Sequence, residues 1–279
     1  MQKIKIFMCA HKSFELLPPL TVAVQGGAVL NETISGAIPD FGSGGSISEM
    51  NPDYCELTVQ YYALKNEDAD YYGFCHYRRF FSFCDKAKTP YTVLGAPKSG
   101  NIKKIIFDEE RMREVIESCD VLLPKSEDMG YDVYTQYESV AGCKRDDLLL
   151  FEELICKRFP YLSQYAKEYL CGRRQYFCNM FVMKKEIFLD YSERLFATLS
   201  EFDRLSKPNG ELRRDRVDGY LAERFLGIYA LYLKSNGKNV KEVSRVDVGC
   251  SAKKILLHKL FPPETKRRFW AKKILKSRG

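Results

Sequence analysis

Long apolar segments are missing from this chain of 279 residues, and so are several common nucleotide motifs. No run of about 18 apolar residues occurs, so we predict no membrane-spanning helix. The chain has no G-x-x-x-x-G-K-[S/T], no G-x-G-x-x-G and no G-x-S-x-G, which argues against P-loop, Rossmann and serine-hydrolase chemistry. With three histidines and no C-x-x-C among ten cysteines, the sequence disfavours a zinc site and indicates reduced core thiols in a cytoplasmic protein.

The positive charge of the chain is concentrated at its C-terminal end. The net charge is +7, but residues 253–279 hold ten Lys or Arg and one acid, Glu264, and so contribute +9. The remaining residues, 1–252, are close to neutral, which argues against a nucleic-acid partner. We therefore predict a globular body at 1–252 and a basic amphipathic tail at 253–279.

Aromatic and aliphatic residues alternate with the cations of this tail. A helix starting at Thr265 would bring Trp270 and Ile274 together on one face. Such a helix suits an anionic membrane surface, where each cation contributes roughly 1 kcal/mol. The alternative is a solvated helix that packs on the body.

Apolar strand-like segments alternate with amphipathic helical ones along the body. Strands are expected at 3–10, 21–24, 71–81, 120–124, 176–183 and 240–248, and helices at 51–66, 107–118, 146–158, 161–170, from 185 and at 217–234. This alternation predicts an α/β fold with a mostly parallel, buried central sheet. Asn51 is expected to cap its helix, and the Gly/Ser segment 42–48 to be a lid or a flexible connector.

Cationic side chains follow the expected strands, where parallel sheets bind their ligands. The candidates are His11, Lys12, His76, Arg78, Arg79 and Lys125. A guanidinium group binds phosphate through two hydrogen bonds, so the segment 75–79 predicts an anion site. If the strand continued, residues 76 and 78 would share one face, and Arg79 would lie on the other and pair internally. The alternative is a structural ion pair at a sheet edge.

Four segments carry a family resemblance: ISEMNPDYCELTVQYYALKN (47–66), YYGFCHYRRFF (71–81), YFCNMFVMKKEIFLDYSERLF (176–196) and RVDGYLAERFLGIYALYL (216–233). In this order they resemble bacterial capsular and exopolysaccharide glycosyltransferases that were first catalogued as a domain of unknown function. Some relatives are galactofuranosyltransferases. The resemblance implies that residues 1–252 form a GT-A-like nucleotide-sugar-binding domain.

The same resemblance implies a reaction and its partners. The donor would be a nucleotide sugar, with UDP expected, and the acceptor a growing capsular, exopolysaccharide or O-antigen glycan linked to polyprenyl diphosphate. We expect an inverting hexosyl transfer by a peripheral protein at the cytoplasmic face of the membrane. The alternative is a non-catalytic binding or scaffolding subunit of a polysaccharide assembly complex.

The reaction needs a group that stabilises the leaving diphosphate and a base that takes a proton from the acceptor. Many GT-A enzymes hold a divalent metal with Asp-x-Asp, but Asp68-Ala69-Asp70 precedes its strand and is predicted to be a turn. Cations at 76–79 would replace the metal, and Mn²⁺ or Mg²⁺ stays open as the alternative. Glu223 is the first candidate base, with an ion pair to Arg78 or Arg79 as its alternative role.

Two further residues complete the predicted site. Asp218 is the second candidate base, although relatives tend to have an aromatic residue at this position. Asn179, inside an apolar segment, is expected to hydrogen-bond either the backbone or the donor sugar.

Overall fold

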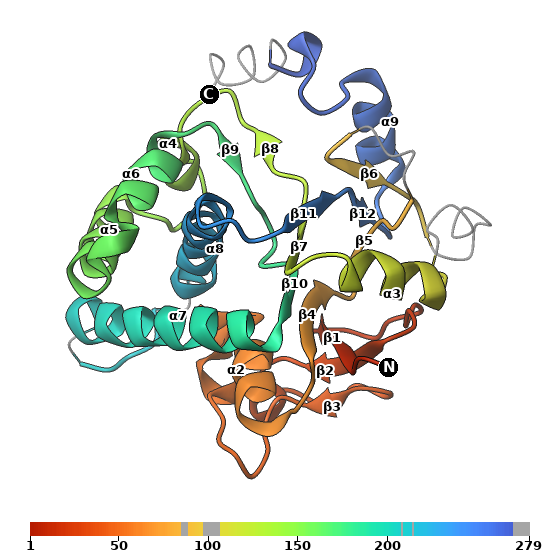
Figure 1. Cartoon of the computed structure of the whole chain (residues 1–279), viewed down its shortest axis with the longest axis horizontal. Coiled ribbons are helices and arrows are strands. Elements are labelled where there is room, and N and C mark those ends of the chain that lie inside the picture. Colours follow the sequence, from red (N-terminus) through yellow and green to blue (C-terminus); the bar gives the residue numbers. More distant parts are fainter. Residues whose placement is uncertain (85–88, 97–106, 208, 214, 270–279) are drawn as a thin grey trace.

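A mixed β-sheet runs through the computed structural model, which describes residues 1–84, 89–96, 107–207, 209–213 and 215–269 (Figure 1). Its main path has the order β11 (Val240–Val243), β7 (Val121–Pro124), β10 (Phe181–Lys184), β4 (Tyr71–His76), β1 (Ile4–Ala10), β2 (Thr21–Gln25) and β3 (Ile38–Pro39). Along this path only β10 is antiparallel to its neighbours. The predicted α/β fold with a mostly parallel central sheet is confirmed.

Short strands extend the sheet from the end of β4. They are β5 (Arg79–Phe81), which pairs with β4, then β12 (Arg245–Asp247) and β6 (Tyr91–Val93). The strands β8 (Glu127–Asp128) and β9 (Arg174–Gln175) form a separate two-stranded antiparallel sheet. The prediction of one strand at 71–81 was wrong, because the chain turns back at Tyr77 and Arg78 and pairs His76 with Arg79. The predicted strand at 240–248 is likewise divided between β11 and β12.

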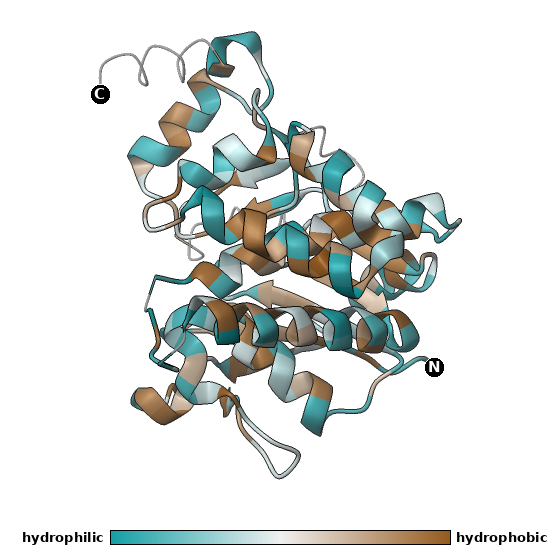
Figure 2. Ribbon diagram, turned by 90° about the vertical axis from the view of Figure 1, so that its left-hand side faces the viewer, coloured by the Kyte–Doolittle hydropathy of each residue, from teal (hydrophilic) through white to brown (hydrophobic). Residues whose placement is uncertain are grey.

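Helices cover both faces of the sheet, as Figure 1 shows. The larger layer contains α2 (Leu57–Asn66), α5 (Arg145–Arg158), α6 (Ser163–Cys171), α7 (Lys185–Ser206) and α8 (Val217–Ser235), and α3 (Glu109–Glu117) lies on the opposite face. The shorter helices are η1 (Ala28–Leu30), η2 (Ser48–Met50), α1 (Asn51–Tyr54), α4 (Val133–Glu138), η4 (Pro160–Leu162) and α9 (Ala252–Leu260). In Figure 2, hydrophobic and hydrophilic residues alternate along the helices, as helices half-buried against a sheet require.

The central strands are buried on both faces, which explains their nearly continuous apolar sequence. In β4, Tyr72 and Phe74 enter the core cluster under the larger helical layer, and Tyr71 and Cys75 enter the cluster on the other face. The ring of Phe188 in α7 stacks on Tyr72, with 4.3 Å between centroids. These aromatic contacts fix α7 on the sheet.

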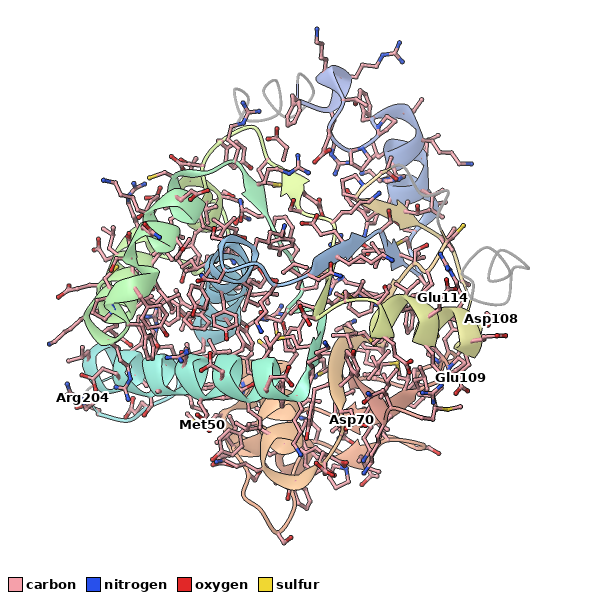
Figure 3. The ribbon with its side chains drawn as sticks, viewed as in Figure 1. Met50, Asp70, Asp108, Glu109, Glu114 and Arg204 are labelled. Atoms are coloured by element: carbon pink, nitrogen blue, oxygen red, sulfur yellow. The ribbon has the colours of Figure 1, made fainter. Side chains whose placement is uncertain are left out.

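The predicted helix at 51–66 is interrupted at Cys55, where the backbone has φ 52°. Asn51 does not cap it: its Nδ2 donates to the carbonyl of Cys55 at 2.8 Å and to Oγ1 of Thr58 at 3.2 Å. The asparagine thus bridges the break between α1 and α2. In α3 the expected cap is present, because Asp108 accepts from the backbone N–H of Arg111 (Figure 3). None of the helices within the described residues has the length and apolar character to span a bilayer.

Candidate active site

A cleft of about 600 Å³ opens where β1 and β4 end. These strands are parallel and pair Cys9 with His76, so His11 and His76 emerge at one edge, with 6.1 Å between ring centroids. Because β10 runs in the opposite direction, its first residues rather than its last reach the same edge. The turn before β10 therefore brings Cys178 and Asn179 into the cleft.

Four arginines line this cleft: Arg224, which pairs with Glu223, and three others, Arg78, Arg79 and Arg216. Within the described residues, no carboxylate lies within 4.0 Å of any of the three. The prediction that Arg79 lies on the opposite face and pairs internally was wrong, because the turn at 77–78 resets the strand alternation. Guanidinium groups that have no carboxylate partner among the described residues are suited to bind an anionic ligand.

Arg216 was not among the site residues predicted from the sequence, although it is the first residue of the segment 216–233. It is the residue before α8, in the left-handed region with φ 65°. Its Nε donates to Sγ of Cys55 at 3.2 Å, and its guanidinium lies 5.4 Å from the ring centre of Tyr220. The contact with Cys55, which is distant in sequence, helps to place this cation, so no local motif marks it.

The imidazole of His76 is neutral in this setting. Burial and then the charge of Arg79 lower its pKa to about 3. Its Nδ1 accepts from the backbone N–H of Arg78 at 3.3 Å, which leaves the proton of the neutral ring on Nε2. The neutral ring of His76 therefore carries an N–H that can donate a hydrogen bond, and it adds no positive charge to the cleft.

Backbone strain is concentrated around the cleft. Cys55, Cys178, Asn179 and Arg216 line it with φ angles of 52°, 75°, 46° and 65°, although none of them is glycine. Such conformations cost of order 1–3 kcal/mol each and are typical of functional sites.

Asn179 is held in the turn before β10 rather than in a strand. Its Nδ2 donates to Glu56 at 2.8 Å and to the carbonyl of Gly219 at 2.9 Å. Its Oδ1 is buried and has no hydrogen-bond partner within the described residues. An acceptor atom in this state at a cleft wall suits a ligand hydroxyl. Gly219 permits the arrangement, because a Cβ there would lie 3.3 Å from Cys55.

Glu223 reaches the cleft from α8. One carboxylate oxygen accepts from the backbone N–H of Cys178 at 2.6 Å, and the other from Nη1 of Arg224 at 2.9 Å. The ion pair is thus with Arg224, not with Arg78 or Arg79. Burial raises the pKa of Glu223, and Arg224 opposes this rise. The carboxylate keeps free lone pairs and a raised pKa, as a general base requires.

Several residues that the sequence predicted for the site do not line the cleft. Asp218 is fully buried, accepts from Nζ of Lys207 at 2.7 Å and does not line the cleft. Lys12 is exposed and outside the lining, and Lys125 lines a different hollow. The Gly/Ser segment 42–48 is also outside the lining, and Gly44 donates to Asn66 at the end of α2.

The Asp-x-Asp segment lies at the wrong end of β4 for a metal site. Asp70, which is labelled in Figure 3, directly precedes the strand, whereas His76 is the last residue of the strand. It accepts from the backbone N–H of Lys3, and Asp68 pairs with Lys185. In the part of the chain that the structure describes, no group of three or more His, Cys, Asp or Glu is arranged to hold a metal ion. Of the two carboxylates that line the cleft, Glu56 accepts from Asn179, and Glu223 accepts from Cys178 and Arg224.

Comparison with known proteins gives the family. The model of the Domain of unknown function (DUF4422) matches residues 5–235. The chain belongs to this family. No curated protein matches. Among solved structures, an apo structure of the WbbM bifunctional glycosyltransferase is similar, with a TM-score of 0.80 and 32% identity. The match covers 89% of this chain and 46% of that one, so this DUF4422 chain spans about half of the WbbM length.

Proposed function

We propose that the chain is a glycosyltransferase that binds the diphosphate of a UDP-sugar with Arg78, Arg79 and Arg216. The single observation that carries this proposal is the presence in one cleft of three guanidinium groups that have no carboxylate partner among the described residues. The similarity to a glycosyltransferase supports it. In this proposal the cations neutralise the leaving diphosphate directly, without a metal ion.

The proposed transfer inverts the configuration at the anomeric carbon, because one base and one leaving group act in a single displacement. Glu223 takes the proton from an acceptor hydroxyl, whose oxygen forms a bond to the anomeric carbon of the donor sugar. The bond from that carbon to the phosphate oxygen breaks, and its electron pair stays on the diphosphate among the arginines. We extend the proposal to a hexosyl donor, including galactofuranose, and to a growing polyprenyl-linked glycan as acceptor.

Replacing Arg79 tests the donor site. We expect Arg79→Gln to weaken UDP binding by about tenfold or more, because a charged hydrogen bond contributes about 1.5–3 kcal/mol. Isothermal titration with UDP measures this affinity, and thermal shift with a panel of UDP-sugars, with EDTA or Mn²⁺, then selects the donor. Arg204→Gln is the matched control, because Arg204 is exposed and pairs with Glu201.

Three outcomes of that experiment are decisive. Equal UDP affinity of Arg79→Gln and Arg204→Gln would remove Arg79 from the site. A strict need for Mn²⁺ would contradict metal-free diphosphate binding. Donor binding without turnover on any acceptor would favour the non-catalytic subunit.

We also propose that α9 rests on an anionic membrane. Leu256, Leu257 and Leu260 are exposed by 57%, 47% and 53%, and exposed Lys253 and Lys259 belong to the same helix. Apolar side chains beside cations complement an anionic lipid surface. Trp270 and Ile274, which were expected to share this role, lie outside the described residues.

Part of the tail packs on the body. Residues 266–269 are helical, in line with the helix expected from Thr265. Glu264 pairs with Arg174 at 2.8 Å, and Nη2 of Arg268 donates to the hydroxyl of Tyr91 at 2.6 Å. These contacts hold α9 at a defined place beside the sheet, so lipid contact would orient the whole molecule.

Replacing the three leucines of α9 tests the membrane proposal. We expect Leu256→Ser, Leu257→Ser and Leu260→Ser together to reduce binding to vesicles with anionic lipid at least tenfold, because their apolar area no longer inserts. Co-sedimentation measures binding, with neutral phosphatidylcholine vesicles as the control. UDP affinity should stay unchanged. Undiminished co-sedimentation of the triple variant would exclude α9 as the docking helix.

A further inference from the structure

A second pocket, of about 270 Å³, adjoins the cleft. The two share Arg79, Phe177 and Cys178 as a common wall. The opposite side of the second pocket is formed by the C-terminal segment, with Pro263 and Arg268. A ligand there would thus lie between the candidate donor site and the segment that we propose to face the membrane.

The carboxylates around this second pocket are all paired. Arg245 lies 3.1 Å from Glu127 and 2.8 Å from Asp247, which also accepts from Lys254 at 3.2 Å. Asp128 pairs with Arg173, and Glu264 with Arg174. The lining holds four carboxylates beside four cationic side chains, Arg79, Arg245, Lys254 and Arg268, so its formal charges balance, whereas cations are in excess in the cleft. A wall of balanced polar groups suits a neutral ligand with many hydroxyls better than a second phosphate.

An aromatic ring stands at the junction of the two pockets. Phe177 is half-buried, and within the described residues its ring has no aromatic or cationic partner. The face of such a ring packs against the C–H face of a sugar, while polar neighbours bind the hydroxyls. Phe177 therefore supplies an aromatic face at the junction of the two pockets.

The junction also lies next to the candidate base. Cys178 lines both pockets, and its backbone N–H donates to Glu223 at 2.6 Å. A hydroxyl that extends from the second pocket past Cys178 enters the region of this carboxylate. Its oxygen would then lie between the base, which takes the proton, and the donor sugar, whose bond to the diphosphate breaks.

From this arrangement we propose that the second pocket binds the terminal sugar ring of a neutral glycan acceptor. The assignment rests on the proposed function, because it takes the adjoining cleft as the donor site. It adds the acceptor site, at the side of the cleft that faces the C-terminal segment.

Filling the pocket tests the assignment without changing any charge. Met129 lines the second pocket but not the cleft, and it is half-buried. Met129→Trp should occupy the space of the sugar, and Met129→Leu is the matched control of similar volume. The probes are UDP and methyl glycosides of galactose, glucose, N-acetylglucosamine and rhamnose. Saturation-transfer NMR measures glycoside binding in the presence of UDP.

We expect at least one glycoside to receive saturation with the natural protein and Met129→Leu, and at least fivefold less with Met129→Trp. UDP affinity should agree within twofold for all three proteins. Equal glycoside signals with Met129→Trp, or no signal from any glycoside while UDP binds, would overturn the acceptor assignment. Failure of the natural protein to bind UDP would instead overturn the proposed function.

Discussion

Glu223→Gln is expected to lower sugar transfer by a factor of about 10²–10⁴, the range that a general base contributes. The amide keeps the size of the side chain and a carbonyl oxygen to accept from Cys178, but it cannot take a proton. UDP affinity should therefore change little. Single-turnover transfer from the donor selected by thermal shift, measured beside UDP titration, separates the two effects.

The pH profile of transfer gives a second readout for Glu223. The base acts only when it is deprotonated, so the rate falls as the pH falls through its pKa. Since burial raises this pKa, the decline should begin at a higher pH than for an exposed glutamate, whose pKa is about 4.3. Asp218→Asn is the control, because Asp218 does not line the cleft. If Asp218→Asn abolished transfer and Glu223→Gln did not, the assignment would be reversed.

Lys207→Met is expected to destabilise the fold by about 3–5 kcal/mol, the effect of removing one partner from a buried ion pair. Its Nζ lies 3.0 Å from Asp53, 2.6 Å from Asp203 and 2.7 Å from Asp218. Asp53 and Asp218 are fully buried, so without the lysine their charges repel one another in a medium of low polarity. Urea unfolding measures the loss of free energy.

A double variant separates lost charge from lost packing at this cluster. Lys207→Met with Asp218→Asn should be more stable than Lys207→Met alone, because one uncompensated carboxylate is gone. A destabilisation below 1 kcal/mol for Lys207→Met would show that the lysine is not needed to hold the cluster.

The same cluster makes stability depend on pH. Burial, and then Asp203, raise the pKa of Asp218, against the opposing effect of Lys207. The folded state therefore binds the proton of Asp218 more tightly than the unfolded state, which releases it near about pH 3.9. This contribution to stability is complete below about pH 4 and is lost as the pH rises through the raised pKa of the folded state. Urea unfolding of Asp218→Asn across this range should show a flatter profile than the natural protein.

Local patterns predicted most of the helices because they depend on neighbours in sequence. The helix at 217–234, the Asp108 cap and the strand at 3–10 are present with nearly the expected bounds. The breaks were missed: Cys55 and the turn at Tyr77 and Arg78 lie within segments whose apolar pattern continues across them. Left-handed conformations at non-glycine residues have no marker in the sequence, because the surrounding fold imposes them.

By itself, the sequence determined the family, the class of fold and the cations that follow β1 and β4, since these depend on residue type and order. Only the tertiary structure decided which groups meet. The reversed direction of β10 brings Asn179 to the ends of β1 and β4, and the turn after His76 aims Arg79 into the cleft. Glu223 lies on α8 and Arg216 directly before it, and both line the cleft, while Asp218 of the same helix is buried against Lys207. Strand direction and helix rotation are set by long-range pairing and packing, which a single sequence does not record.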